Sequence, residues 1–229
     1  MNAILGWSKI LRKGQRDQDT VAKALETIER NVESEQRLIE SILDISRIST
    51  RKLRLDVHPV ELQPVIEAVV DTVRPAAETK NIRLRTTLDS EPLVVAGDAW
   101  RLQQIFSNLL SNSIKFTPDK GCVEIILTRN NSHARIEVID SGRGISREFL
   151  PYVFERFRQS EVTAASKDGG LGLGLTIVRH LVDLHSGTIK AASGGEGMGA
   201  IFTVQLPLFT KTVKQKIPKS KKAVNSSKR

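Results

Sequence analysis

The sequence predicts an α/β protein in two parts: a helical hairpin that would form a dimeric four-helix bundle, followed by an α/β domain. Two observations support this prediction. A long helix expected over about residues 19–48 has apolar side chains in steps of three and four. From about residue 57 onwards, short alternating strands and amphipathic helices follow one another. We therefore expect a partial hairpin and linker at residues 1–56, a folded domain at 57–208 and a basic disordered tail at 209–229.

The hairpin begins with a helix expected over residues 2–12, which Gly14 and the Asp17–Thr20 cluster end. The second helix carries a long apolar seam with a period of about 3.5 residues, which is typical of coiled coils. Its members are Val21, Leu25, Ile28, Val32, Ile39 and Ile42. One hairpin cannot cover such a seam, so we expect a second copy of the chain to complete a bundle. A helix packed on its own globular domain is the alternative, which the length and charged outer face of the helix disfavour.

The segment at 51–57 alternates weakly, which predicts a strand, and Pro59 marks the boundary at which the α/β domain begins. Periodicity predicts helices at 61–79, at 99–116 and after Gly172. Alternation predicts strands at 82–88, 93–95, 123–127, 134–139, 187–192 and 200–207. We expect these elements to form an antiparallel or mixed sheet with helices on one face.

The net charge of +9 suggests nucleic-acid binding, but its location argues against this for the folded part. Residues 208–229 hold seven Lys, one Arg and no acid; without these eight, 27 basic residues face 26 acidic ones. The tail has the composition of a solvated, disordered linker. The sequence shows no apolar run of about 18 residues and no signal peptide. The single cysteine, Cys122, excludes an internal disulfide and favours a cytoplasmic setting.

The helix expected at 99–116 presents Asn108, Asn112 and Lys115 within an arc of about 60°. An Asn side-chain oxygen is a hard, neutral ligand that suits Mg²⁺ in the company of phosphate oxygens and water. The Lys115 ammonium offers a point charge to phosphates. A solvated helix face is the alternative interpretation for these three residues taken alone.

Two glycine-rich segments follow. Asp140 ends a strand, where its carboxylate could accept a hydrogen bond from an exocyclic amine, and Gly142 and Gly144 permit a flat ligand to approach closely. An ordinary Asp-Ser-Gly turn is the alternative. Farther on, three glycines precede a helix whose first N–H groups would bind an anion such as a phosphate. They are Gly170, Gly172 and Gly174.

In this order and spacing, the segments Asn108–Thr117, Asp140–Ile145 and Gly169–Leu175 resemble the N box and the two glycine boxes of the sensor histidine kinases. The resemblance covers about residues 1–207. It implies the α/β sandwich shared by histidine kinases, gyrase-type topoisomerases, mismatch-repair ATPases and heat-shock chaperones, with ATP and Mg²⁺ bound.

The resemblance also implies the role of individual residues. Asn112 would be the metal ligand, Asn108 and Lys115 would line the phosphate site, and Asp140 would bind the adenine amino group. The segment between the glycine boxes resembles an aromatic box and an ATP lid, with Phe154 and Phe157 packing the base of the lid. A plain core role is the alternative for both aromatic residues.

One feature departs from the family: the acceptor-histidine box that would precede Asn2 is absent. The four histidines lie in other sequence contexts and none is our phosphoacceptor; they are His58, His133, His180 and His185. In the related ATP hydrolases a water-activating Glu stands four residues before the metal-binding Asn, where this chain has Asn108.

These features together predict the kinase core of a two-component sensor histidine kinase that acts on a histidine outside this sequence. Its expected partners are a second copy of the chain and a response regulator. A non-catalytic nucleotide-binding dimerisation module and a serine kinase of the anti-sigma-factor type are the alternatives.

Overall fold

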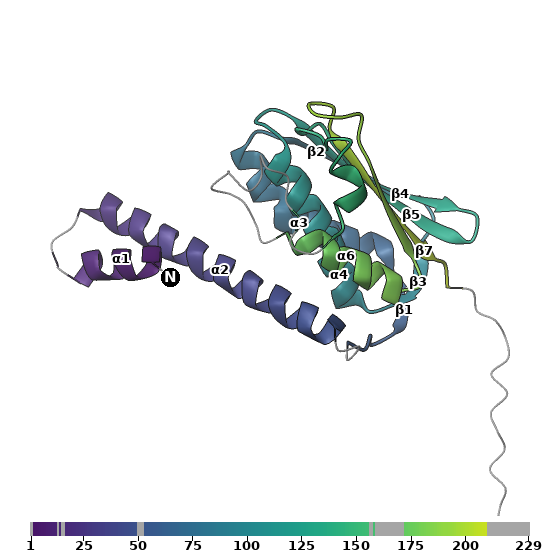
Figure 1. Ribbon diagram of the computed structural model, residues 1–229, viewed down its shortest axis with the longest axis horizontal. Coiled ribbons are helices and arrows are strands. Elements are labelled where there is room, and N and C mark those ends of the chain that lie inside the picture. The colour runs from purple at the N-terminus through teal and green to yellow at the C-terminus, as the bar shows by residue number, and fades with distance from the viewer. Residues whose placement is uncertain are drawn as a thin grey trace, which may run out of the picture.

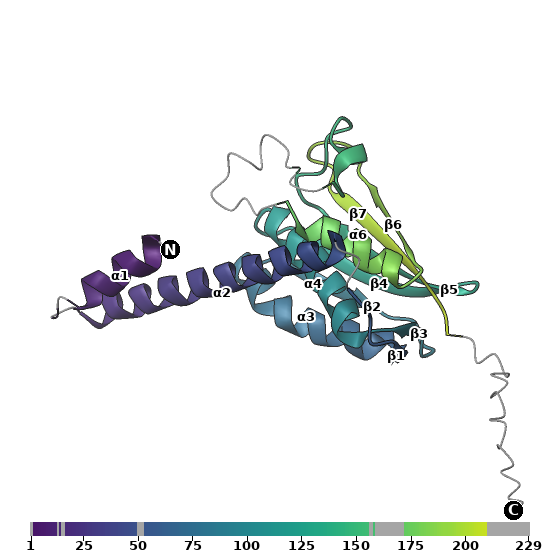
Figure 2. The same ribbon diagram turned by 60° about the horizontal axis from the view of Figure 1, so that its bottom comes forward.

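A computed structural model of the protein describes residues 2–12, 14, 17–49, 53–155, 158 and 172–209. Figure 1 shows that this part of the chain forms a helical hairpin, composed of α1 (Asn2–Arg12) and α2 (Gln18–Ser49), and an α/β domain. α1 lies beside the N-terminal part of α2, whereas the α/β domain lies towards the C-terminal end of α2 (Figures 1 and 2). The predicted fold class, a helical hairpin followed by an α/β domain, is therefore confirmed.

The hairpin covers only one side of its long helix. Asp17 caps α2 by accepting the Thr20 N–H at 2.7 Å. Ala24 is fully buried. On the remaining surface, Leu25, Val32 and Ile39 are 55%, 48% and 59% exposed, and they follow one another at seven-residue intervals. Residues so spaced share one stripe of a helix, so one copy of the chain leaves an apolar stripe uncovered along α2.

The α/β domain contains a five-stranded sheet in the order β2-β4-β5-β7-β6 and a two-stranded sheet of β1 and β3. The strands are β1 (His58–Glu61), β2 (Arg83–Thr87), β3 (Val94–Gly97), β4 (Cys122–Asn130), β5 (His133–Asp140), β6 (Thr188–Ala192) and β7 (Ala200–Pro207). The helices are α3 (Leu62–Thr79), α4 (Ala99–Phe116), the short 3₁₀ helix η1 (Leu150–Tyr152) and α6 (Gly174–Leu184). Because β2 pairs parallel with β4 and the other neighbours are antiparallel, the large sheet is mixed.

The core lies between this sheet and the helices α3, α4 and α6, which cover one of its faces (Figure 1). In β5, alternate residues from Ala134 to Asp140 are buried, as expected for a strand with one face on the core. α4 buries a complementary stripe against the sheet, formed by Leu102, Ile105, Phe106 and Leu109. The opposite face of α4 is therefore available for polar side chains.

The strand predicted at 51–57 is wrong for the described residues 53–57, which form none. The strand starts instead at His58 and runs antiparallel to β3, with Pro59 inside it. Pro59 is tolerated there because a two-stranded sheet does not need every backbone donor. The N–H of Asp56 donates to the Asp98 carboxylate at 3.1 Å and not to a neighbouring strand.

The end of β7 returns to the small sheet, where the Phe209 N–H donates to the Val94 carbonyl at 2.7 Å. The rest of the expected tail, residues 210–229, lies outside the described residues. No helix in the described ranges combines the length and the apolar character needed to cross a bilayer.

Candidate nucleotide-binding site

Helix α4 forms one wall of the candidate site, and both of its ends are anchored. At its start, the Asp98 carboxylate accepts the N–H groups of Trp100 and Arg101 at 3.1 and 3.2 Å, an N-cap of the usual kind. At its end, the Lys80 ammonium donates to the carbonyls of Ile114, Lys115 and Thr117. A cation at a helix C-terminus is favourable because the last carbonyls lack partners in the helix. This anchoring fixes the direction in which the polar face of α4 points.

The start of α6 faces that polar face. A side chain added at Gly174 would place its Cβ 3.5 Å from the Asn108 side-chain oxygen and 3.8 Å from the Asn112 side-chain nitrogen. Gly172, just before α6, has a φ of +68°, a conformation that side chains disfavour. The structure therefore brings together two amides and a helix N-terminus predicted from separate segments. Gly170, the first glycine of this group, lies outside the described residues.

Asp140 is the buried acid of the site. One of its carboxylate oxygens accepts the N–H groups of Gly142 and Ala200 at 2.9 and 3.2 Å, and the other accepts the Ser113 hydroxyl at 3.2 Å. Burial raises the pKa of Asp140 above its ordinary value of 3.8, and these three hydrogen bonds oppose that rise. Ser113 belongs to α4, so the acid at the end of β5 is tied directly to the helix that carries Asn112.

The glycine loop after Asp140 has no room for side chains. At Gly142 an added Cβ would lie 2.7 Å from both the Asp140 carboxylate and the Phe116 carbonyl oxygen. Gly144 has a φ of +72° and faces the backbone of Gly195 in the turn between β6 and β7. That turn supports the loop, because Gly199 donates its N–H to the Gly142 carbonyl at 3.0 Å. Both predicted glycines thus occupy positions that only glycine fits.

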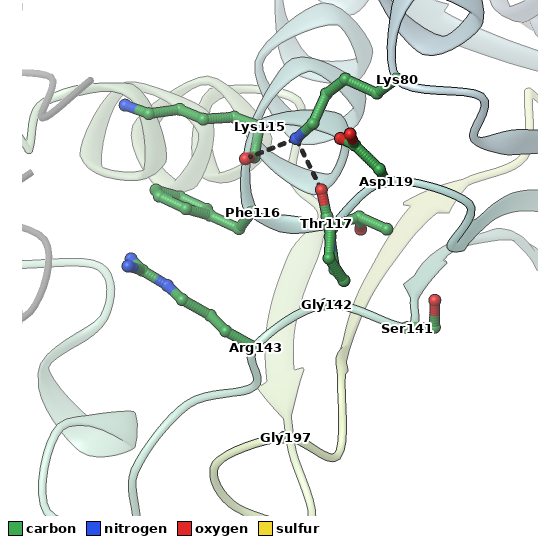
Figure 3. Close-up of a pocket in the computed structure, with 10 residues that line it drawn as sticks. Lys80, Lys115, Phe116, Thr117, Asp119, Ser141, Gly142, Arg143 and Gly197 are labelled. Carbon is green, nitrogen blue, oxygen red and sulfur yellow. Dashed lines mark hydrogen bonds between the residues drawn. The ribbon is translucent and has the colours of Figure 1, made fainter. Parts of the chain in front are cut away.

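A cavity of about 680 Å³ opens beside this loop and the end of α4 (Figure 3). Its lining is formed by Lys80, Lys115, Phe116, Thr117, Pro118, Asp119, Ser141, Gly142, Arg143 and Gly197. The Arg143 guanidinium carbon lies 4.1 Å from the centre of the Phe116 ring, and the Lys115 nitrogen lies 5.1 Å from it. The cavity therefore combines an aromatic surface with cations. Of the predicted site residues, Lys115 and Gly142 line it directly.

Phe154 lies apart from this cavity. Its ring meets Phe202 of β7 edge to face, with ring centres 6.4 Å apart, and its carbonyl accepts the Thr176 hydroxyl of α6 at 3.0 Å. Phe154 therefore packs on the sheet while fixing the start of α6. Phe157, the second predicted aromatic residue, and most of the segment expected to form a lid lie outside the described residues.

Several residues around the site were not predicted from the sequence. Ser113 and Lys80 donate hydrogen bonds to predicted residues. Phe116 and Arg143 line the cavity, as Lys80 also does. Phe116 and Arg143 stand inside the motifs that the sequence singles out, which is the one signal that could have found them. No sequence signal points to Lys80, because its partners lie at least 34 residues away.

The geometry can hold a ligand that has an exocyclic amine, an aromatic ring and phosphates. The carboxylate of Asp140, the amides of α4, Lys115 and the α6 N-terminus are the donor set that ATP and Mg²⁺ would require, so the residues present fit the expected ligand. These residues lie on a domain whose mixed sheet is covered by helices on one face.

Residues 97–210 match the model of the histidine kinase-, DNA gyrase B- and HSP90-like ATPase family, and this part of the chain belongs to that family. The chain is 34% identical over 254 residues to hybrid signal transduction histidine kinase D of Dictyostelium discoideum. This alignment covers 91% of this chain and 16% of that protein. It is 33% identical over 216 residues to the autoinducer 2 sensor kinase/phosphatase LuxQ of Vibrio parahaemolyticus. This second alignment covers 91% of this chain and 25% of that relative.

Among solved structures, full-length ShkA in complex with AMPPNP is 26% identical, with a TM-score of 0.71 over 91% of this chain and 43% of that one. These relatives place the chain among sensor histidine kinases, and its domain is the catalytic domain of that class. The chain spans about a quarter or less of the length of the two curated relatives.

Proposed function

We propose that this chain is the kinase core of a two-component sensor histidine kinase, which binds ATP with Mg²⁺ and transfers the γ-phosphoryl group to a histidine outside this sequence. The observation that supports this most directly is the meeting of Asn108, Asn112 and the start of α6 beside the buried Asp140. Catalysis of phosphoryl transfer is mostly positioning and charge stabilisation, so a site of this kind needs no covalent intermediate on the protein.

Each residue has a defined part in this proposal. Asp140 accepts a hydrogen bond from the adenine amino group, and the loop of Gly142 and Gly144 lets the base approach the backbone. Asn112 supplies an oxygen ligand to Mg²⁺, which would neutralise phosphate charge when bound. Lys115 and the first N–H groups of α6 hold phosphate oxygens, and Asn108 lines the same site.

The acceptor is assigned outside the sequence because none of the four histidines lies on α1 or α2. His58 and His133 begin strands, and the former pairs with Asp56 at 2.8 Å. His180 and His185 lie on or just after α6. Each belongs to the same folded domain as the nucleotide site, whereas the proposed acceptor lies on a hairpin like that of α1 and α2.

The uncovered stripe of Leu25, Val32 and Ile39 supports a homodimer through the hairpin. Membership of the two-component class supports a response regulator as the next phosphoryl acceptor, and a cytoplasmic setting. An ATP hydrolase needs a base near the attacking water. The amide of Asn108, which stands where the hydrolases have a Glu, cannot take a proton, and this argues against hydrolysis as the function.

Labelled ATP tests the proposal. The parent chain should bind ATP with Mg²⁺ and show almost no self-labelling. Adding a separate histidine-bearing hairpin of the family type should give a phosphoryl bond that acid cleaves and base leaves intact. An acid-stable product would indicate a serine kinase, and fast ATP turnover without an acceptor would indicate a hydrolase. ATP binding with no phosphoryl transfer to the added hairpin would favour the non-catalytic nucleotide-binding module.

A further inference from the structure

The C-terminal part of α2 is bonded to the first turns of α4 through charged and polar side chains. The Arg101 guanidinium donates to both oxygens of the Asp44 carboxylate at 2.9 Å. Gln104, one turn farther along α4, donates to the same carboxylate at 2.7 Å and accepts from Arg101 at 2.8 Å. Asp44 is 4% exposed and Arg101 is 7% exposed, so this contact is shielded from water.

Burial changes what such a contact contributes. Removing two charges from water costs about as much as their attraction returns, so a buried pair is weak evidence for stability. Its hydrogen bonds nevertheless form at one register only, because a carboxylate that shifts along α4 would lose both Arg101 and Gln104. An apolar contact between the same helices would tolerate such sliding, since dispersion is not directional. The cluster therefore specifies orientation more than it adds stability.

The same end of α4 also holds the linker. The Asp98 carboxylate, which caps α4, accepts the N–H of Asp56 at 3.1 Å. The Trp100 ring stacks on the Arg101 guanidinium with its centre 4.4 Å from the guanidinium carbon. Both α2 and the linker that follows it are thus bonded to the start of α4.

We propose that Asp44, Arg101 and Gln104 form an orientation lock that fixes the angle between the hairpin and the ATP-binding domain. At 1.5 Å per residue, Arg101 lies about 10 Å along α4 from Asn108 and about 16 Å from Asn112. The buried ion pair of the lock thus lies about two turns before the first predicted nucleotide contact, and it sets where the site points. Opening the lock frees the domain to turn on the hairpin and leaves the site itself intact. The geometry of the lock does not depend on the proposed function; its effect on phosphoryl transfer does.

Spin-label distances test the lock directly. In the full chain with Cys122→Ser, labels at Glu29→Cys on α2 and Asn131→Cys in the β4–β5 turn report the angle between the two parts. Both positions are exposed, and dilution with unlabelled protein limits the signal to one copy. The parent should give one narrow distance distribution. Arg101→Met should broaden and shift it, because Met keeps bulk but bonds to neither partner.

Asp44→Leu is the second variant, because Leu has a similar size and can accept no hydrogen bond. Position 44 lies on α2 outside the core of the domain, so this variant should fold even if the Arg101 variant does not. Asp71→Leu is the matched control: Asp71 pairs with Arg74 at 3.1 Å on an exposed surface, with side chains 75% and 49% exposed. It should leave the distribution unchanged. The double variant Asp44→Leu/Arg101→Met should broaden the distribution no more than either single change, because both remove the same contact.

Unchanged distances in Asp44→Leu would overturn the lock. Nucleotide affinity supplies the second readout: it should stay within about twofold of the parent in both variants, whereas a tenfold loss, equivalent to about 1.4 kcal/mol, would show that the cluster supports the site and not the orientation. Transfer to an added hairpin should change in rate with an unchanged KM for ATP. If distances broaden but no chain, parent included, transfers phosphate, the proposed function fails and the lock stands.

Discussion

Asp140→Asn separates recognition of the base from folding. Asparagine has nearly the same shape, and its side-chain oxygen can still accept the N–H groups of Gly142 and Ala200. Its NH₂ group would replace the carboxylate oxygen that faces the Ser113 hydroxyl, and that hydroxyl can turn to accept. The three contacts that hold residue 140 therefore survive the substitution, while the negative charge is lost.

The loss in nucleotide binding follows from that charge. A hydrogen bond to a charged group contributes about 1.5–3 kcal/mol, which is roughly a 10- to 150-fold change in dissociation constant. We expect calorimetry to show a loss of ATP affinity within this range. Asp119→Asn is the control, because Asp119 is an exposed acid that lines the cavity beside the loop after Asp140; the ATP affinity of this variant should match that of the parent.

The stability of Asp140→Asn should move in the opposite direction. Because burial raises the pKa of Asp140 in the folded protein, its contribution to stability is fully present below the ordinary pKa of 3.8 and is lost as pH rises through the folded pKa. At neutral pH the ionised carboxylate is therefore costly, and the variant should melt at the same temperature or higher. Unchanged ATP affinity would refute the proposed contact between Asp140 and the adenine base. A lower melting temperature would refute the inference that the ionised carboxylate destabilises the fold at neutral pH.

Three further outcomes are expected. Light scattering should find a dimer for the parent chain and a monomer for Ile39→Glu, which charges the exposed stripe of α2; a monomeric parent would exclude the bundle. Gly144→Ala should abolish ATP binding, because its φ of +72° and the adjacent Gly195 backbone leave no place for a side chain, whereas Gly6→Ala in open space should bind normally. Burial lowers the pKa of His185 below 6.5, so thermal stability should fall as pH drops below that value; His185→Gln should lose this dependence.

The sequence predicted elements best where one face of a helix or strand is apolar. The helix expected at 99–116 has the bounds observed for α4, since Asp98 offers a side-chain cap and the helix stops two residues before Pro118. The strand expected at 51–57 is wrong for the described residues 53–57, because weak alternation does not supply a partner strand; the backbone N–H of Asp56 donates to a side chain instead. Alternation predicts burial of one face and cannot specify what lies opposite.

The candidate site was predictable in its motifs and not in its support. Asn108, Asn112 and Gly174 stand in recognisable segments, and folding brings them together. Lys80 is a single lysine at the end of α3 with no local pattern, and its carbonyl partners are set by tertiary packing. The pairing of Asp44 with Arg101 spans 57 residues and joins two helices that each look ordinary alone.

α4 connects these observations physically because it is one rigid element with different partners at its two ends. Its first turn is bonded to α2 through Arg101 and to the linker through Asp98. The N–H of Asp98 also donates to the His185 ring at 3.1 Å, while the other ring nitrogen of His185 donates to the Leu181 carbonyl at 2.7 Å. The Leu181 carbonyl can only accept, so Nδ1 holds a proton; the Asp98 N–H can only donate, so Nε2 holds none. That histidine is therefore neutral.

The polar residues of the predicted site lie two to four turns farther along the same helix. A hairpin that turns relative to the sheet must therefore either break the contacts at the first turn or tilt α4 as a whole. Packed helices change between discrete arrangements more readily than they deform. The buried Asp44–Arg101 pair, formed at one register only, supplies one of those arrangements.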